Sequence, residues 1–188
     1  MDHYLDIKIL PDPEFPPAML VNALFTKLHR VLVQLQSKQI GISFPNVDQS
    51  KPFLGNVLRI HGTSSVLQNL LAQHWLKGMN DHLEVKAINA VPVDTPHCRV
   101  RRVQIKSNAE RLRRRYRKRH EGVTELDALA MIPDTVEKQL SLPYLQLKSD
   151  STGQRFRLFI VHSPPQQQPV AGEFNRYGLS AKATIPWF

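Results

Sequence analysis

The chain has 188 residues, 41% of them hydrophobic, and its formal net charge is +9. That length allows one large domain or two small ones, and the hydrophobic content excludes a disordered chain. The excess positive charge lies in residues 99–120, where eleven Lys and Arg residues stand against one acid, while the rest of the chain is close to neutral. We therefore expect an acidic partner that binds at this segment.

Several classes of protein are excluded by simple features. Cys98 is the only cysteine, which excludes an intrachain disulfide and a zinc site built on several cysteines. The N-terminal stretch MDHYLDIKIL carries acids where a signal peptide would be basic, and no apolar run approaches the length of a membrane span. We expect a soluble, cytoplasmic protein with no membrane partner.

The first half of the chain predicts the order β-α-β-β-α-β. Strands are expected at residues 5–9, 40–44, 58–60 and 83–87, with helices from Pro17 to about Gln36 and within 64–76, the second opened by a serine cap. The predicted core positions of the helices are Leu20, Ala23, Leu24, Leu28, Val31 and Leu35 in the first, and Val66, Leu67, Leu70, Leu71 and Trp75 in the second. This order is typical of a ferredoxin-like fold, which RNA-binding modules share with many unrelated proteins.

The fold class predicted for the whole chain is α+β, with two domains. Residues 1–94 would form the ferredoxin-like domain and residues 95–188 a second α+β domain, joined by the linker AVPVDTP. The second domain should begin with a strand over 98–106 whose Val103 and Ile105 face inward. An arginine-rich helix, a short helix capped by Thr124, and two strands around a Ser-Thr-Gly turn should follow, and the aromatic tail should help close a core.

The stretch ERLRRRYRKRH is predicted to be a helix. Ser107 stands three residues before Glu110, which is the spacing of a capping box. Ala109, Leu112 and Tyr116 form a narrow apolar stripe that would dock the helix on its domain. Like charges at helical spacing repel, and one acid cannot offset seven cations, so a surface for a polyanion explains the pattern better than a solvated face or a targeting tag. Arginine suits forked contacts to phosphate and guanine.

The sequence shows no clustered carboxylates of a divalent-metal nuclease and no phosphate-binding glycine loop, and no metal or other cofactor is expected. Phosphodiester cleavage would then require RNA, whose 2′-OH can attack the adjacent phosphate when a base removes its proton. His29, at the edge of the first helix's apolar stripe, is a candidate base, although a histidine in such a place is more often structural. Hydroxyls in the 149–152 turn are a weak signal, because turn hydroxyls usually bond their own backbone.

Short stretches in a fixed order resemble the CRISPR repeat-processing endoribonuclease of type I-F (Ypest subtype) systems. They are MDHYLDI, PDPEFPP, the LH at His29, GISFP, LRIH, RVQIKSNAERLRRR, IPDTV, STGQRFRLF, YGLS and PWF, and they run through nearly the whole chain. Such enzymes bind a repeat stem-loop and cut at its 3′ base without a metal, leaving a 2′,3′-cyclic phosphate and a 5′-OH. They keep the product hairpin and join other subunits in a crRNA-guided surveillance complex, and the resemblance implies the same activity and partners here.

The resemblance also implies roles at the cleavage site. His29 would be the general base, Ser149 would orient the 2′-OH, and Tyr177 would support the histidine. Ser151 and Thr152 would help to position the RNA. Asp150 lies between the two serines, and its carboxylate is expected to point outward, because it would disfavour the reaction if it faced the phosphate.

For RNA binding, the resemblance implies that Phe156 stacks under the terminal base pair of the stem, as aromatic platforms do. Arg102 and Gln104 would hydrogen-bond the base edges of the lowest pairs. The residues of the arginine helix that would face the RNA in the major groove are Arg114, Arg115, Lys118 and Arg119. The major groove of A-form RNA is deep and narrow but opens near helix ends, so a short stem is the expected ligand.

Two other functions remain open from the residues alone. One is a non-catalytic subunit that binds an RNA hairpin in a ribonucleoprotein complex, and it differs from the enzyme at His29, Ser149 and Tyr177. The other is a DNA-binding module, because charge alone does not distinguish DNA from RNA. Residues 164–173 are expected to form a polar loop.

Overall fold

The structure is a computed structural model that describes residues 1–104, 109–133, 141–149 and 153–188, with only the backbone of Arg111. The chain divides into two compact units, one formed by residues 1–103 with 142–188 and the other by residues 104–141. We call these the larger unit and the arginine-helix unit. The domain boundary expected between residues 94 and 95 stays a prediction.

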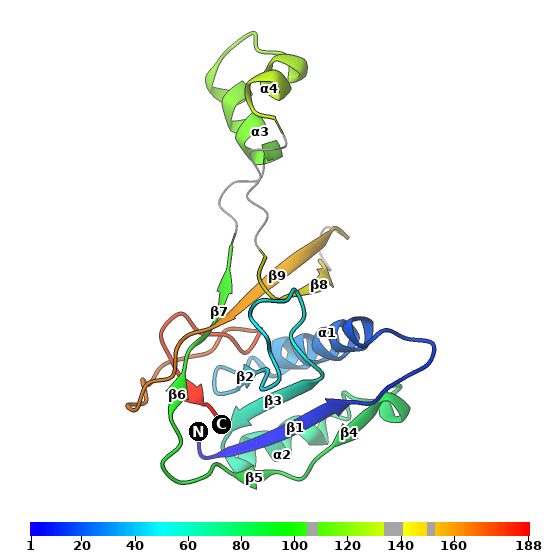
Figure 1. Cartoon of the computed structure of the whole chain (residues 1–188), viewed down its shortest axis with the longest axis vertical. Helices are drawn as coiled ribbons and strands as arrows, with labels where there is room; N and C mark the ends of the chain where they lie inside the picture. The colour runs from blue at the N-terminus through cyan, green and yellow to red at the C-terminus, as the bar shows by residue number, and fades with distance from the viewer. Residues whose placement is uncertain (105–108, 134–140, 150–152) are drawn as a thin grey trace. The chain divides into compact units, whose positions relative to one another are not determined.

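The larger unit contains the predicted β-α-β-β-α-β elements (Figure 1). The sheet has the order β2-β3-β1-β4, with β5 also paired to β1, and every pairing is antiparallel. Leu5, Ile7 and Ile9 are buried, as their alternation predicted. The elements of this part are β1 His3–Ile9, α1 Pro17–Leu35, β2 Gly41–Ser43, β3 Val57–Gly62, α2 Ser64–Ala72, a short 3-10 helix Asn80–His82, β4 Leu83–Val85 and β5 Asn89–Ala90. The α+β class is therefore confirmed.

Helix α1 buries more of its circumference than the sequence predicted. Ala23 is exposed and Leu35 only half-buried, whereas Val21, Phe25 and Leu32 are buried, so the predicted stripe was partly wrong. The reason is that α1 packs against β1 on one side and against strand β8, Tyr144–Lys148, on the other. A helix covered on two sides needs apolar residues over a wider arc than a surface helix does.

The N-terminus of α2 also differs from the prediction. The capping residue is Thr63, whose hydroxyl accepts a hydrogen bond from the backbone N–H of Val66 at 3.4 Å, and not a serine. Trp75 is buried as predicted but lies beyond the last residue of the helix.

The tail of the chain covers the face of the first sheet that lies opposite the helices. Strand β10, Ile185–Pro186, pairs with β6, His97–Cys98. A Cβ on Gly41 would lie 2.5 Å from the Ile185 side chain, so only glycine permits this approach. Arg59 makes a two-pronged ion pair with Asp6 and donates to the carbonyl oxygen of Phe188 at 2.7 Å. The tail closes a core mainly through buried Ala183 and Ile185, while Trp187 is half-buried and Phe188 is exposed, so the expectation for the aromatic tail is confirmed only in part.

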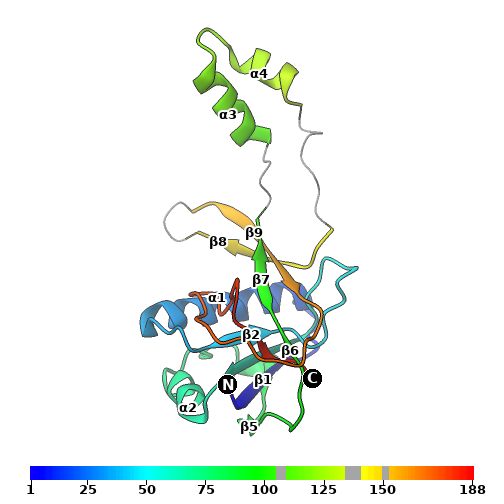
Figure 2. The ribbon, with the colours of Figure 1, turned by 90° about the vertical axis from the view of Figure 1, so that its left-hand side faces the viewer.

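A second sheet in the larger unit has the order β7-β9-β8, with β7 Val100–Val103 and β9 Arg155–His162 (Figure 2). The predicted hairpin of β8 and β9 is confirmed. The predicted facing of β7 was wrong, because Arg102 pairs with buried Ile160 and shares the inner face with Val100, while Val103 lies on the outer face. Arg102 tolerates this place because β7 is an edge strand, where a long side chain reaches past its neighbours. Ile105 and Lys106 lie outside the described residues.

The arginine-helix unit consists of α3, Ala109–Arg119, and α4, Glu125–Met131. Thr124 caps α4 as predicted, in a capping box with Asp127. Helices α3 and α4 pack on each other, with Ala109 and Ala128 buried, so the apolar stripe of the arginine helix does find a partner. Ser107, the expected cap of α3, lies outside the described residues. No helix in the described part of the chain is long and apolar enough to cross a membrane.

Two histidines are enclosed in the larger unit in their neutral form. Nε2 of His61 lies 2.8 Å from the Ser43 hydroxyl, and Nε2 of His162 accepts from the backbone N–H of Phe44 at 3.2 Å. Burial, helped by the charge of Arg59, lowers the pKa of His61 to about 3. Burial also lowers the pKa of His162 to about 4. Both rings therefore resist protonation in the folded protein.

The free energy of unfolding should fall as the pH drops from about 6.5 towards 4, because the unfolded chain takes up protons that these folded histidines do not. Above about 6.5 both states hold neutral rings, and this contribution to stability is complete. Denaturant unfolding across this pH range measures the slope. His61→Gln and His162→Gln should each flatten it, and an unchanged slope in both variants would contradict the assignment.

Candidate active site and nucleic-acid interface

A hollow of about 270 Å³ lies in the larger unit between α1, the β8–β9 hairpin and the loop that carries Tyr177. It brings together four residues that the sequence singled out for cleavage or stacking and that lie in three distant parts of the chain. Its lining residues are Thr26, His29, Arg30, Leu147, Lys148, Ser149, Phe156 and Tyr177. We call this hollow the His29 pocket.

The hydrogen bonding of His29 determines which ring nitrogen carries the proton. Nδ1 lies 2.8 Å from the carbonyl oxygen of Arg176, a residue 147 positions away. A carbonyl oxygen only accepts, so Nδ1 must be the donor. In the neutral imidazole the other nitrogen, Nε2, then keeps its lone pair, which is the form that a general base requires.

Tyr177 holds the imidazole from its face. The two rings are nearly parallel, at 7°, with centroids 4.3 Å apart, and Tyr177 is in turn stacked against Phe25 of α1 at 6.3 Å. A ring clamped by a stack on its face and a hydrogen bond at its edge has little rotational freedom.

A tight loop positions both partners of His29. The side chain of Asn175 accepts from the backbone N–H of Tyr177 at 2.8 Å and of Leu179 at 3.3 Å. Gly178 has a φ of +69°, and a Cβ there would lie 2.7 Å from Ile42, so the turn requires glycine. The motif YGLS therefore contains the glycine that this turn requires.

Ser149 stands at the end of β8, where the hairpin begins its turn. Its backbone N–H donates to the carbonyl oxygen of Gln154 at 2.9 Å, and its carbonyl oxygen accepts from the backbone N–H of Gly153 at 2.8 Å. These bonds extend the strand ladder and place the half-buried serine on the wall of the His29 pocket. Asp150, Ser151 and Thr152 lie outside the described residues, and their roles stay predictions.

Phe156 and Arg102 are neighbours on the inner face of the second sheet. The guanidinium carbon of Arg102 lies 5.9 Å from the centre of the Phe156 ring. Nε of Arg102 is buried and has no hydrogen-bond partner within the described part of the chain. Gln104, expected to work with Arg102, is exposed and belongs to the arginine-helix unit.

The cations of α3 divide into two groups around the helix. Nε of Arg113 donates to the carbonyl oxygen of Ile132 at 2.8 Å, and Arg117 lies 3.6 Å from the carboxylate of Glu125. These two therefore face α4. The residues predicted to bind RNA, which are all exposed and occupy one continuous arc at 3.6 residues per turn, are Arg114, Arg115, Lys118 and Arg119.

Sequence reasoning missed Lys148 and Arg30 as members of the pocket, although each stands beside a predicted site residue. It also could not separate Arg113 and Arg117 from the other cations of α3. Within the described ranges, no group of His, Cys, Asp or Glu is arranged to hold a metal ion. Burial raises the pKa of Cys98 to about 12, which makes this thiol unsuited to act as a nucleophile.

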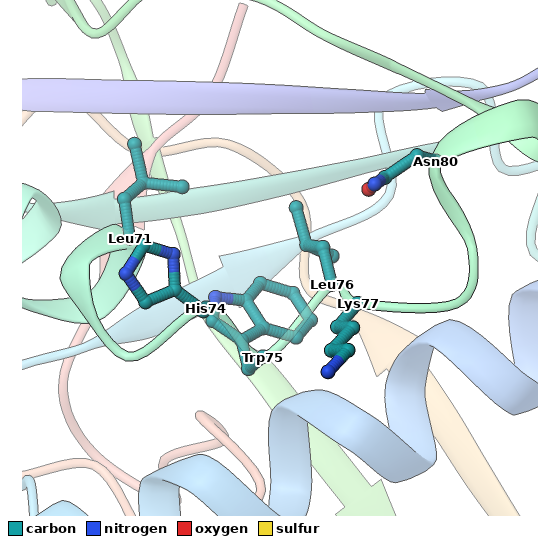
Figure 3. A pocket seen from close by; sticks show the side chains of 6 residues that line it. All are labelled: Leu71, His74, Trp75, Leu76, Lys77 and Asn80. Atoms are coloured by element: carbon teal, nitrogen blue, oxygen red, sulfur yellow. The ribbon is translucent and has the colours of Figure 1, made fainter.

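A hollow of about 390 Å³ lies on the loop after α2, away from these residues. Figure 3 shows its lining side chains, which are Leu71, His74, Trp75, Leu76, Lys77 and Asn80. None of the predicted site residues belongs to it.

Comparison with known proteins agrees with the sequence resemblance. The chain is 52% identical over 188 residues, covering all of both chains, to a protein of Pseudomonas aeruginosa strain UCBPP-PA14 named "CRISPR-associated endonuclease Cas6/Csy4". It is 47% identical, again over the full length of both, to a protein of the same name from Escherichia coli strain UTI89. A solved structure described as "An RAMP protein binding different RNA substrates" matches 98% of this chain and 99% of that one, at 13% identity and a TM-score of 0.35, which does not establish a shared fold.

The model of the family described as CRISPR-associated protein (Cas_Csy4) matches residues 4–188. With a match of this extent and relatives this similar, the chain belongs to the Cas_Csy4 family.

Proposed function

We propose that the protein is a metal-independent endoribonuclease that binds the stem-loop of a CRISPR repeat and cuts at its 3′ base. The observation that carries this proposal is the His29 pocket, where an imidazole whose Nδ1 donates to the carbonyl oxygen of Arg176 lies in one hollow with Ser149 and Tyr177. The relatives named as CRISPR-associated endonucleases support it. The protein would act in the cytoplasm and keep its product hairpin within a crRNA-guided complex with other subunits.

In the proposed reaction, Nε2 of His29 accepts the proton of the 2′-OH next to the scissile phosphate, while Ser149 orients that hydroxyl. The 2′-oxygen forms a bond to phosphorus as the bond from phosphorus to the 5′-oxygen breaks. The departing 5′-oxygen takes up a proton from solvent, so the products are a 2′,3′-cyclic phosphate and a 5′-OH. Lys148 and Arg30 also line the pocket, and their positive charge would stabilise the phosphate as its charge increases.

The stem would end on Phe156, with its terminal base pair stacked on the ring and Arg102 beside it. The guanidinium of Arg102 lies beside the Phe156 ring and would donate hydrogen bonds to a base edge. Gln104 would read the neighbouring pair, and the exposed arc of α3 would enter the major groove. Ser151 and Thr152 would hold the RNA near the cut.

We also infer that the first sheet is ferredoxin-like, and its order β2-β3-β1-β4 with α1 and α2 supports this. RNA-recognition modules with a four-stranded sheet stack bases on its open face. In this protein Arg59, Ile185 and Phe188 occupy that face. The RNA would therefore bind at the second sheet and not at the first.

Replacing His29 by alanine should lower the rate of cleavage by about 100- to 10,000-fold, the usual contribution of a general base, with little change in affinity. The measurement is single-turnover cleavage of repeat RNA in EDTA, with identification of the product ends. The matched control is His3→Ala, which removes a half-buried histidine hydrogen-bonded to Asp2.

A 2′-deoxy nucleotide at the cut site should likewise abolish cleavage and preserve binding. A wild-type protein that binds the hairpin tightly without cutting it would favour the non-catalytic hairpin-binding subunit. Equal affinity for the matching DNA hairpin would favour the DNA-binding module.

Tyr177→Phe should retain most of the activity, because the phenyl ring preserves the stack on His29. Tyr177→Ala should reduce the cleavage rate by up to about 100-fold, the cost of misplacing a reacting group by roughly 1 Å. Rates of both variants at saturating enzyme measure this difference. Equal losses in the two would assign the role to the hydroxyl instead of the ring.

Arg115→Ala and Arg119→Ala should each cost about 1–3 kcal/mol of binding free energy if they read bases. If they contact only phosphates, the loss should be smaller and uniform across stem sequences, with a salt slope lower by about 1. Arg117→Ala is the control on the same helix, because an exposed ion pair at 3.6 Å contributes little.

Titrations with the repeat hairpin and a mutated stem at several salt concentrations distinguish these cases. A loss for Arg117→Ala as large as that for Arg119→Ala would contradict the division of α3 into two groups.

A further inference from the structure

The outer face of the second sheet, opposite to the face that carries Arg102 and Phe156, carries four cations, of which only Lys148 takes part in the proposed reaction. The register places Lys148 opposite Arg155 and Gln146 opposite Arg157 on this face. Arg101 lies on the same face of β7, opposite Val161. Because side chains alternate along a strand, these residues all project to one side, and the four cations among them are exposed.

Two properties of this face indicate a nucleic-acid ligand. Strands β7, β8 and β9 contain no acidic residue, and like charges directly opposite each other on neighbouring strands destabilise a sheet. The pair of Lys148 and Arg155 therefore costs stability. A ligand with negative charge would offset that cost when it binds.

Aromatic rings lie between the cations. The guanidinium carbon of Arg157 lies 4.8 Å from the centre of the Tyr144 ring, and Tyr144 contacts Phe159 with ring centroids 5.6 Å apart. Tyr144 also borders an apolar hollow of about 440 Å³ that includes Phe53. A row of cations with a partly exposed aromatic ring is the arrangement that binds single-stranded nucleic acid, with phosphates on the cations and bases stacked on the ring.

This face is continuous with the His29 pocket, because Lys148 belongs to both. A strand that leaves the cleavage point would reach the outer face at Lys148. We propose that single-stranded RNA adjoining the repeat stem binds across the outer face, on Lys148, Arg155, Arg157, Arg101 and Tyr144. This inference rests on the proposed function and extends it from the hairpin to the RNA that flanks it.

The test compares three RNAs in a protein carrying His29→Ala, which keeps them intact. One is the bare hairpin, one carries a single-stranded extension on the 5′ side, and one carries it on the 3′ side. In this background Arg101→Gln/Arg157→Gln removes two charges from the outer face at residues that do not line the His29 pocket. Lys8→Gln/Lys86→Gln removes two exposed charges, one in β1 and one directly after β4, as the matched control.

We expect one extension to increase affinity, and we expect Arg101→Gln/Arg157→Gln to remove most of that increase without changing binding of the bare hairpin. In the double variant, the slope of log affinity against log salt concentration for the extended RNA should become shallower by up to about 1.4. Each lost phosphate contact to a single strand contributes about 0.7 to this slope. Tyr144→Leu, which keeps an apolar side chain, should reduce the increase by roughly tenfold if a base stacks there.

Three results would overturn the inference. An extension that adds no affinity would remove its premise, while hairpin binding and the proposed function would stand. Equal effects of the two double variants would show that general charge, and not this face, is responsible. If the bare hairpin fails to bind, the proposed function fails and this inference fails with it.

Discussion

The hydrogen bond from Nδ1 of His29 to the carbonyl oxygen of Arg176 connects the first helix to a loop near the end of the chain. It sets the tautomer of the ring, and the stack on Tyr177 sets its plane. Both contacts require the turn at Gly178 to pack closely against Ile42 of the first sheet, because this turn places Arg176 and Tyr177. The chemistry proposed for the pocket therefore depends on how closely the tail packs against the core.

The same packing explains why the base lies on a helix that is buried on two sides. Helix α1 contacts both β1 and β8, so only a narrow part of its circumference is left exposed. His29 sits at the margin of this exposed part, with Thr26 and Arg30 beside it in the pocket. The second sheet that covers α1 brings Ser149 and Phe156 to that margin. The contacts that bury α1 are therefore also the contacts that bring the pocket residues together.

Much of the fold follows from patterns that a sequence displays. The alternation of Leu5, Ile7 and Ile9, the cap at Thr124 and the pairing of β8 with β9 depend on neighbouring residues, and these predictions are confirmed. The burial of Phe25 and Leu32 was missed because it requires knowledge that a second sheet covers α1. Arg102 was placed on the wrong face because its strand's register depends on β9, which lies far along the chain.

The site was predictable to a different extent. His29 was a candidate base from its place on the first helix, whereas the roles of Ser149, Phe156 and Tyr177 came from the resemblance. No local pattern places these four residues together. The acceptor for His29 is a backbone carbonyl, which every residue has, so composition and spacing give no signal for it. The sequence also could not show which cations of α3 face α4 and which are exposed. Arg113 and Arg117 are distinguished only by their contacts with a carbonyl oxygen and a carboxylate at α4.

The most direct test of the central claim is the tautomer of His29 in the free protein. Nitrogen NMR of protein labelled at the histidine rings, with His29→Gln used to assign the signals, reports which nitrogen carries the proton when the ring is neutral. The structure predicts a proton on Nδ1 and an unprotonated Nε2. A proton on Nε2 would contradict the account, because that nitrogen could not then accept the proton of the 2′-OH.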